Sequence, residues 1–402
     1  MSRYYLRAHF GLVLAVCLCM SSPSQMTAVK TVGPDGPYDV GVRVVNIDYK
    51  GQTMPVMVWY PAEASSQAPY LYNTSIKGVA VKNAMPYQPA GPFPLIVFSH
   101  GMGGCAPQHV FINEELASHG YVVYAPDHDE SAMCHIRGKP EISSARLTFS
   151  VLKNNFVLSG VVMDLFGEMM RERNYDFSYR PAEIKAVIDR ALADNADVSS
   201  FMYGMIDPAK IGMSGHSLGG YTGLMIAGMP YHCDVELSSH QCDFDNISLH
   251  NTPNPCCLEY IRKLGPRAFK DDRVKATLVM SPAIMFPQLG RAATGLDQPI
   301  MLINGDDEDF EVPWQPLQTI YDNAPPPKYL VRLKNTDHMT AVDSTLAIPL
   351  ARIALPGFRF HFKEKAKAYN ALAVYFFDRH LKGEEDEKLP SSDFAEVWRN
   401  TR

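Results

Sequence analysis

A serine between glycines is the residue of this chain best suited to nucleophilic chemistry. Ser217 lies in residues 215–219, whose sequence is Gly-His-Ser-Leu-Gly, between the apolar stretches 209–213 and 220–227. This order predicts a strand, a sharp turn centred on the serine, and a helix. The glycines permit a strained turn that holds the hydroxyl clear of the sheet, and the positive N-terminal end of the helix points at it. We therefore predict that Ser217 is a nucleophile.

Acyl transfer by a serine also needs a base and an acid that orients the base. His338 follows the predicted strand 329–333, which places it on the next loop. Four acidic residues, 306–309, follow the predicted strand 300–303. Asp309 is our choice for the acid, because a proline four residues later is common after the acid in such folds, and Asp307 is the alternative. The chain order serine, acid, histidine is that of the α/β-hydrolases.

The negative charge of the reaction intermediate needs two main-chain N–H donors. One is expected from Leu218, directly after the serine. The other is expected from Met102, because the loop after the predicted strand 95–98 is rich in glycine and can approach a substrate closely. The nearby His100 and His216 are predicted to support their turns rather than to transfer protons.

The predicted elements that position these residues alternate between strand and helix. Short, strongly apolar strands at 95–98, 121–125, 274–281, 299–304 and 329–333 alternate with helices at 108–119, 181–195 and 363–381. This alternation predicts an α/β fold with a mostly parallel central sheet and helices on both faces. Two earlier strands, 38–46 and 52–60, are expected at one edge of the sheet, followed by a Pro- and Ala-rich connection through Pro94.

Residues 35–385 are predicted to form one α/β-hydrolase domain, with insertions at about 127–179 and 231–266 and a C-terminal tail at 386–402. Within the first insertion, apolar residues recur at helical spacing from 147 to 170. This pattern indicates either a helix packed on the body or a cap beside the site that contacts lipid. Periodicity alone favours the packed helix.

The N-terminus predicts secretion. Residues 1–25 combine basic residues, the apolar run 10–20 and small residues, which is typical of a signal peptide, and the run is too short to span a bilayer. An oxidising compartment would permit disulfides among the six cysteines beyond the signal, with pairing left open: 105, 134, 233, 242, 256 and 257. Zinc is the alternative, but paired Cys-x-x-Cys elements are lacking. Asn73 and Asn246 are glycosylation acceptors by sequence.

Charge and composition limit the partners. The net charge of −6 and the pI near 6.1, with no basic run, argue against nucleic acid. No metal or organic cofactor is expected, because acyl transfer by a serine requires neither. A small ester or phospholipid is the expected substrate class.

Several segments together resemble a known group of α/β-hydrolases. Residues 98–104 (Phe-Ser-His-Gly-Met-Gly-Gly), 116–121 (Leu-Ala-Ser-His-Gly-Tyr) and 215–220 (Gly-His-Ser-Leu-Gly-Gly) look like the platelet-activating factor acetylhydrolases and the dienelactone-hydrolase-like esterases. Residues 36–43 and 58–61 are similar too, so that the resemblance covers about residues 35 to 382. Dienelactone hydrolases proper use a cysteine nucleophile, so their activity does not carry over.

One departure from the resemblance concerns the acid. The secreted animal acetylhydrolases carry it soon after the preceding strand, where this chain has Ser281, Pro282 and Ala283. The sequence therefore looks more like the bacterial-type members, whose acid follows the next strand.

Three functions follow as hypotheses. The resemblance implies a secreted serine esterase that cleaves the short or oxidised sn-2 acyl ester of a phospholipid through an acyl-enzyme. A broad carboxylesterase or polyester hydrolase would use the same residues. An inactive α/β-hydrolase used for binding is the hypothesis from another class, and retention of Ser217 and His338 argues against it.

Overall fold

A computed structural model describes most of the chain after the first 28 residues. The described residues are 29–72, 76–132, 134–136, 146, 149–150, 153, 176–229, 259, 263, 267–283, 295–306, 314–343, 362–385, 388–390 and 395–400. The predicted signal peptide, both glycosylation acceptors, most of the two predicted insertions and the four cysteines from 233 to 257 lie outside them.

The described residues form twelve strands of one sheet. They are β1 (Val29–Lys30), β2 (Asp39–Tyr49), β3 (Gln52–Ala62), β4 (Pro69–Tyr72), β5 (Ile76–Lys82), β6 (Phe93–Ser99), β7 (Val122–Pro126), β8 (Ile206–His216), β9 (Val274–Met280), β10 (Ile300–Gly305), β11 (Lys328–Leu333) and β12 (Ala395–Asn400). Their spatial order is β1-β5-β2-β3-β7-β6-β8-β9-β10-β11-β12, with β4 paired to β5.

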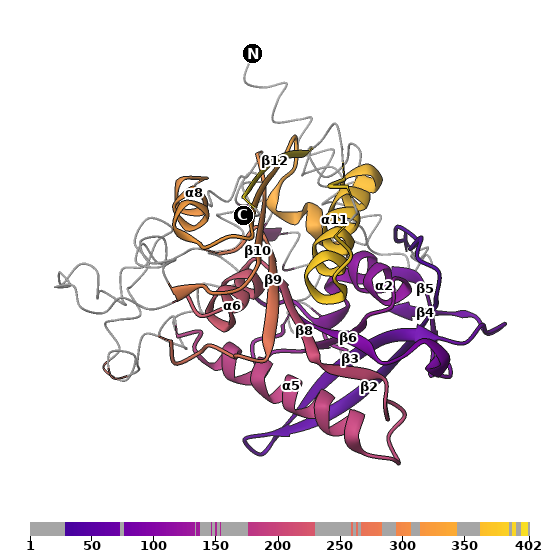
Figure 1. Ribbon diagram of the computed structural model, residues 1–402. Coiled ribbons are helices and arrows are strands. Elements are labelled where there is room, and N and C mark those ends of the chain that lie inside the picture. The colour runs from indigo at the N-terminus through magenta and orange to yellow at the C-terminus, as the bar shows by residue number, and fades with distance from the viewer. Residues whose placement is uncertain are drawn as a thin grey trace.

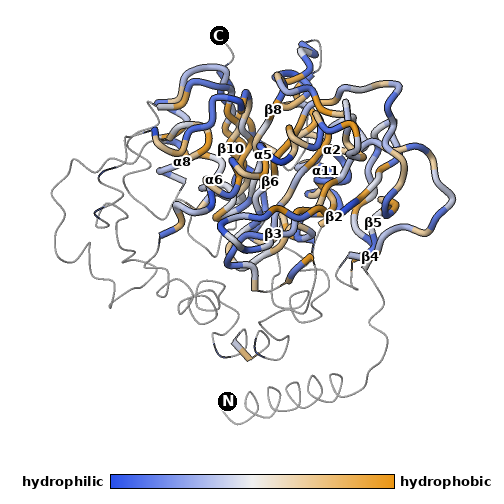
Figure 2. Tube along the Cα trace, turned by 90° about the horizontal axis from the view of Figure 1, so that it is seen from below, coloured by the Kyte–Doolittle hydropathy of each residue, from blue (hydrophilic) through white to orange (hydrophobic). Residues whose placement is uncertain are grey.

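The centre of the sheet is parallel, as predicted. Strands β7, β6, β8, β9, β10 and β11 pair in parallel throughout. Every residue of β6, β7 and β10 is buried, because helices cover both faces of these strands. In Figure 2 the hydrophobic residues concentrate on the central strands β6, β8 and β10. These strands end at a common edge, where their loops meet.

The helices lie in two layers, one on each face of the sheet (Figure 1). Helices α2 (Val110–Ser118) and α11 (Phe362–Phe377) pack on each other and share one hydrophobic core with the sheet. Helices α5 (Tyr179–Ala196), α6 (Leu218–Ile226) and α8 (Trp314–Asn323) contribute to two other cores. The helices predicted at 108–119, 181–195 and 363–381 are confirmed, with short 3-10 and π segments at Ala106–His109 and Asp378–Lys382; α8 was not predicted. No described helix combines the length and apolar character needed to cross a membrane.

The prediction for the N-terminal strands was wrong in one respect. Strands β2 and β3 are present as expected and pair antiparallel with each other, but they do not lie at an edge of the sheet. Strand β3 pairs with β7, and β2 pairs on its other side with β5. The connection through Pro94 contains β4 and β5, which extend the sheet. Their short segments lack the long apolar alternation that makes a strand recognisable.

The predicted C-terminal tail also needs correction. Residues 395–400 form β12, which pairs antiparallel with β11 and extends the domain beyond residue 385. The indole of Trp398 lies 5.6 Å from that of Trp314, and the Arg332 guanidinium lies 4.4 Å over the Trp314 ring. These contacts hold β12 at the sheet edge, although the acidic and polar residues before it are typical of a tail.

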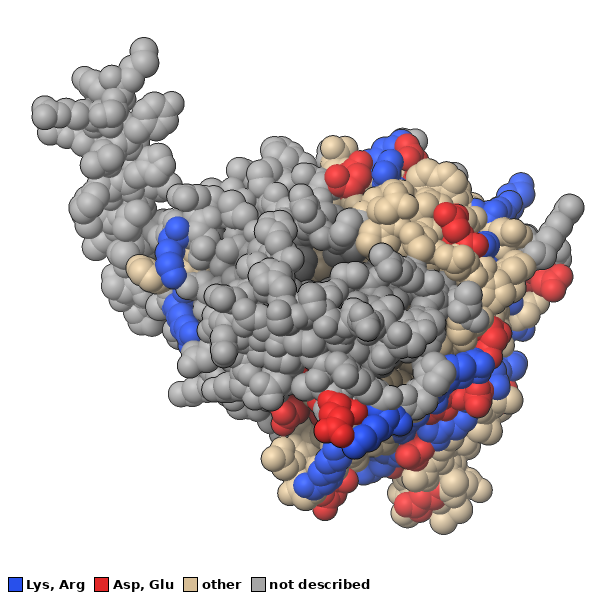
Figure 3. Space-filling view, turned by 90° about the vertical axis from the view of Figure 1, so that its left-hand side faces the viewer, with Lys and Arg blue, Asp and Glu red and all other residues tan. Residues whose placement is uncertain are grey.

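Charges of both signs are interspersed over the described surface in Figure 3. One disulfide is present among the described cysteines. Cys105, after the loop that follows β6, bonds to Cys134, after β7, with a Cα–Cα distance of 5.4 Å. It ties together two loops at the edge of the sheet where the strands end.

Candidate active site

Ser217 is the single residue of a sharp turn between β8, which ends at His216, and α6, which begins at Leu218. Its backbone has φ 56° and ψ −119°, a conformation that is strained for a residue with a side chain. The turn is held because Ser217 N–H donates to Met280 O (3.0 Å) and Ser217 O accepts from Ala283 N–H (2.9 Å). Ser217 is half-buried, whereas both of its neighbours are buried. The turn therefore presents this one side chain toward the surface.

Two glycines of the turn are required by close backbone contacts. A Cβ on Gly215 would lie 2.4 Å from Gly219 O, and a Cβ on Gly219 would lie 1.9 Å from Ser99 O. Real Cβ atoms do not approach so closely, so any other residue would push the end of β6 away from the start of α6. The glycines thus bring the loop after β6 against the serine turn.

The loop after β6 lies directly beside the serine. A Cβ on Gly101 would lie 3.4 Å from Ser217 Cβ. The next residue, Met102, is half-buried and packs against the hydrophobic cluster that contains Leu218. Leu218 is the first residue of α6, and an N–H in this position has no acceptor within the helix. The structure therefore brings both predicted main-chain donors next to Ser217.

His338 lies beside His216, the residue before Ser217, although its loop follows a strand three places along the sheet from β8. It begins the 3-10 turn His338–Ala341, five residues after β11, and is buried. Its ring centroid lies 4.8 Å from that of His216, and His216 Nε2 donates to His338 O (2.8 Å). Burial lowers the pKa of His216 well below its ordinary value, which keeps its ring neutral. His216 therefore supports the histidine loop, in agreement with the expectation for it.

The acidic loop starts beside the histidine loop. Asp306 N–H donates to Leu333 O (3.0 Å), and Asp306 Oδ1 accepts from Asn335 N–H (2.5 Å). Asp306 itself is exposed, and its carboxylate is engaged in the hydrogen bond with Asn335 N–H. Asp309 and its alternative Asp307 lie outside the described residues, so the choice between them stays a prediction.

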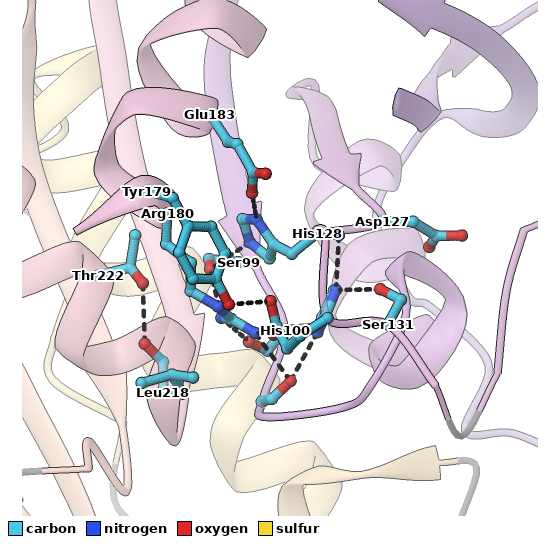
Figure 4. Close-up of polar contacts among 12 residues, drawn as sticks. Ser99, His100, Asp127, His128, Ser131, Tyr179, Arg180, Glu183, Leu218 and Thr222 are labelled. Carbon is cyan, nitrogen blue, oxygen red and sulfur yellow. Dashed lines mark hydrogen bonds and ion pairs between the residues drawn. The ribbon is translucent and has the colours of Figure 1, made fainter. Parts of the chain in front are cut away.

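Sequence reasoning missed a second set of serine, histidine and acid. Ser99 Oγ lies 2.8 Å from His128 Nε2, and His128 Nδ1 lies 2.6 Å from Glu183 Oε2 (Figure 4). All three side chains are buried. Ser99 is the last residue of β6 and His128 follows the neighbouring parallel strand β7, and this position at the same edge of the sheet is the signal that could have pointed to them.

Two basic side chains join this buried set to the loop after β6. Arg180 Nη1 donates to His100 O (2.6 Å) and to Ser99 Oγ (3.3 Å). His100 Nδ1 donates to the carbonyl of Gly101 (2.6 Å), and its Nε2 accepts from His128 N–H (3.2 Å). Figure 4 shows Arg180 and His100 lying on either side of this loop. His100 thus supports the loop, as expected.

Burial shifts the titration of these groups. It lowers the pKa values of His100 and His128 well below the ordinary value, with a further contribution from the positive charge of Arg180. Burial also raises the pKa of Asp127 to about 7 against two main-chain hydrogen bonds that favour its charged form. Because these imidazoles are neutral, the buried set avoids the free-energy cost of placing charged histidines away from water.

One cluster of described side chains has the donor types of a metal site. Asp35, Glu115 and His119 lie together at the far end of α2 from the serine turn. His119 Nε2 lies 3.1 Å from Asp35 Oδ1 and 3.4 Å from Glu115 Oε1, and the pKa of His119 is raised by these hydrogen bonds even though burial opposes the shift. The contacts are those of an imidazolium with two carboxylates.

Comparison with known proteins agrees with this geometry. Residues 70–151 match the family described as platelet-activating factor acetylhydrolase, isoform II. A platelet-activating factor acetylhydrolase of Cavia porcellus is 26% identical over 223 residues, which are 47% of this chain and 50% of that protein. That of Canis lupus familiaris is 25% identical over 186 residues, covering 42% and 40%. The chain thus spans half or less of the length of these relatives.

A solved structure, a ferulic acid esterase from Streptomyces cinnamoneus, shares the fold. It superimposes with a TM-score of 0.56 at 18% sequence identity, over 93% of this chain and all of that one. Together with the parallel sheet and its flanking helices, these matches show that the chain has an α/β-hydrolase fold and is similar, over part of its length, to the platelet-activating factor acetylhydrolases.

Proposed function

We propose that the chain is a serine esterase that works through an acyl-enzyme. Ser217 Oγ attacks the ester carbonyl while His338 takes its proton, and the carboxylate of Asp309 orients the imidazole. The N–H groups of Met102 and Leu218 donate to the oxyanion. Collapse of the intermediate expels the alcohol, which receives the proton from His338, and a water molecule activated by His338 then releases the acid and frees Ser217.

The observation that carries this proposal is the strained, half-buried Ser217 at the start of α6, with the loop after β6 packed against its turn. A residue that is strained and held by the surrounding backbone is commonly functional. The N-terminus of α6 adds a positive partial charge at the place where negative charge develops. The buried Ser99, by contrast, has no strain and no access.

The substrate we propose is the short or oxidised sn-2 acyl ester of a phospholipid, cleaved by a secreted enzyme. The names of the two matched relatives support acetyl-ester chemistry. A broad carboxylesterase is the second candidate, supported by the name of the structural neighbour, a ferulic acid esterase.

The test is Ser217→Ala, with Ser199→Ala at an exposed turn as the matched control. We expect Ser217→Ala to lose at least about 10⁴-fold in kcat for 4-nitrophenyl acetate, with an unchanged melting temperature, and to lose covalent labelling by a fluorophosphonate. The control should keep both. Turnover by Ser217→Ala at the wild-type rate would overturn the assignment of the nucleophile.

The substrate class is tested with a series of phosphatidylcholines. Their sn-2 chains run from acetyl to palmitoyl, beside nitrophenyl esters of the same acids. We expect kcat/KM to be highest for the short phospholipid chains. Equal rates on the simple esters would favour the broad carboxylesterase, and absence of turnover with no labelling of Ser217 would favour the binding module.

A further inference from the structure

Arg180 is a fully buried cation whose hydrogen bonds converge on one loop. It is the second residue of α5, and none of its surface is exposed. Its Nη1 donates to His100 O at 2.6 Å and its Nη2 to Gly101 O at 3.2 Å. These two successive carbonyls belong to the loop that carries Met102. A buried charge needs strong partners, and the main chain of that loop supplies two of them.

The carbonyl of Gly101 and the N–H of Met102 belong to the same peptide group. This peptide is trans, because the cis peptides are elsewhere, at 91–92 and 326–327. In a planar trans peptide the C=O and N–H bonds point in opposite directions. Gly101 O accepts from Arg180, from His100 Nδ1 (2.6 Å) and from Gly104 N–H (3.1 Å). With its carbonyl held by three donors, the peptide directs Met102 N–H away from Arg180.

The position of Arg180 is itself fixed by surrounding groups. Its Nη2 forms an ion pair with Glu130 Oε1, and both side chains are fully buried. Glu130 Oε2 accepts from Tyr179 Oη (2.5 Å), which also belongs to α5. The set of Ser99, His128 and Glu183 adds the 3.3 Å contact between Arg180 and Ser99 Oγ. Figure 4 shows Tyr179, Arg180 and Glu183 reaching from α5 toward the loop.

We propose that Arg180 is a positioning residue for the oxyanion hole. Its planar guanidinium binds two successive carbonyls and thereby holds the Met102 N–H in the orientation that the transition state requires. This inference rests on the esterase proposed above. The buried serine, histidine and acid then serve as the support of this guanidinium, and Ser99 is not a second nucleophile.

The geometry requires an arginine because one group must reach both carbonyls and Glu130. A lysine keeps the positive charge and can pair with Glu130, but its single nitrogen cannot reproduce the two-nitrogen fork. Arg180→Lys therefore removes positioning while it leaves the buried charge compensated. The matched control is Arg190→Lys, because Arg190 lies on the same helix, pairs with Asp194 (2.8 Å) and donates to Asn46 O (2.6 Å) on a more exposed face.

The experiment measures turnover of 4-nitrophenyl acetate per active site, with sites counted by fluorophosphonate titration. We expect Arg180→Lys to lower kcat by about 10- to 100-fold, below or near the effect of losing one oxyanion donor, with KM within about threefold of wild type. A trifluoromethyl ketone, whose adduct carries an oxyanion, should bind more weakly by the same factor as kcat falls. Arg190→Lys should match the wild type in all three.

Several outcomes would overturn the proposal. One is an unchanged kcat per titrated site in Arg180→Lys. Another is a fall only in the number of sites that the fluorophosphonate labels, because a purely structural role would reduce the folded fraction and leave kcat per site unchanged. If Arg180→Lys does not fold, Glu130→Gln replaces it, because this change loosens the guanidinium without removing it, and an unchanged ketone affinity there overturns the inference. A wild type that is neither labelled nor active would overturn both the esterase and the inference, whereas an active wild type separates them.

Discussion

Two serine–histidine arrangements lie within neighbouring loops of this fold, and they differ in access and strain. Ser99, His128 and Glu183 form the more complete hydrogen-bonded row, with contacts of 2.8 and 2.6 Å, but the row is buried. Ser217 lies at a positive φ of 56° on a half-buried turn beside the loop of Met102, with His338 on the loop after β11. Hydrogen-bond geometry alone would therefore choose Ser99, whereas access and strain favour Ser217, the nucleophile that we propose.

The comparison shows what each arrangement is built to do. The buried row has neutral imidazoles and satisfied donors, and Arg180 also donates to Ser99 Oγ, so its hydroxyl is held in place. A nucleophile needs the opposite, a hydroxyl with room for a substrate and donors aimed at empty space. Strain at Ser217 and saturation at Ser99 are thus the features that separate the two.

The largest expected difference comes from removing each histidine. We expect His338→Ala to lower kcat/KM for 4-nitrophenyl acetate by about 10⁴-fold or more, because the general base is lost, with little change in stability. His128→Ala should instead lower stability more than activity. It leaves Ser99 and Glu183 buried without their partner, so we expect a loss of about 2–4 kcal/mol in the free energy of unfolding and a far smaller loss of activity per titrated site.

Both variants are measured by urea unfolding and by fluorophosphonate-titrated kinetics. If His128→Ala abolished turnover while the protein stayed fully folded and labelled, the buried row would have a direct part in catalysis. The distinction between an accessible catalytic set and a buried supporting row would then be wrong.

The next largest effect should identify the third member of the accessible set. We expect Asp309→Asn to lower kcat by about 10³- to 10⁴-fold, because an amide stabilises the wrong tautomer of His338 and cannot balance the imidazolium charge. Asp306→Asn is the control on the same loop, since the amide oxygen of asparagine can still accept from Asn335 N–H. Steady-state kinetics of these two variants and of Asp307→Asn identify the acid. A large loss of kcat in Asp307→Asn alone would assign that role to Asp307.

The sequence drew attention to Ser217 and not to the buried row for a physical reason. The turn at Ser217 is local, because its glycines, strand and helix lie within about twenty consecutive residues. The buried row joins residues separated by 29 and 55 positions, and only the packing of α5 against β6 and β7 brings them together. Arginines are also rarely buried, so nothing in the sequence marked Arg180.

The fold shows the same division between local and distant determinants. Strands β6 to β11 were predictable from their continuous apolar runs. Strands β4, β5 and β12 depend on pairing with strands already formed, as does the tilted ring contact between Trp398 and Trp314. Asp309 and most of the first insertion lie outside the described residues, so the predictions for them still rest on the sequence.

A smaller effect is expected from the disulfide that joins the two regions. Cys105 follows the loop of Met102, and Cys134 follows the segment of His128. The bond closes a loop of 29 residues, so we expect the double variant Cys105→Ala/Cys134→Ala to lose about 3–4 kcal/mol in the free energy of unfolding. Urea unfolding without reductant measures this loss. An unchanged midpoint would mean that Asp127 and the packing around it hold the two segments together without the bond.

The last expected effect is a dependence of the free energy of unfolding on pH, and it comes from the buried region. Asp127 precedes His128, and its carboxylate accepts from Ala106 N–H (2.9 Å) and Ile136 N–H (2.6 Å), next to the two cysteines. Burial raises its pKa from 3.8 to about 7, so between these values the folded protein holds a proton that the unfolded chain releases. The free energy of unfolding should therefore fall as pH rises from about 4 to about 7, by at most about 1.4 kcal/mol per pH unit from this group.

Asp127→Asn removes this dependence, because the amide does not titrate. At pH 5 the variant should be less stable than the wild type by about 1–3 kcal/mol, since one of the two N–H groups loses its acceptor. As pH rises to 8 the wild type loses stability and the variant does not, so the difference should shrink or change sign. Urea unfolding at pH 5, 6, 7 and 8 measures it, with the exposed Asp48→Asn as the control for losing one charge. If the difference in stability between Asp127→Asn and the wild type were constant across this range, Asp127 would be ionised in the folded protein. The buried region would then hold a charged carboxylate, in contrast to its neutral histidines.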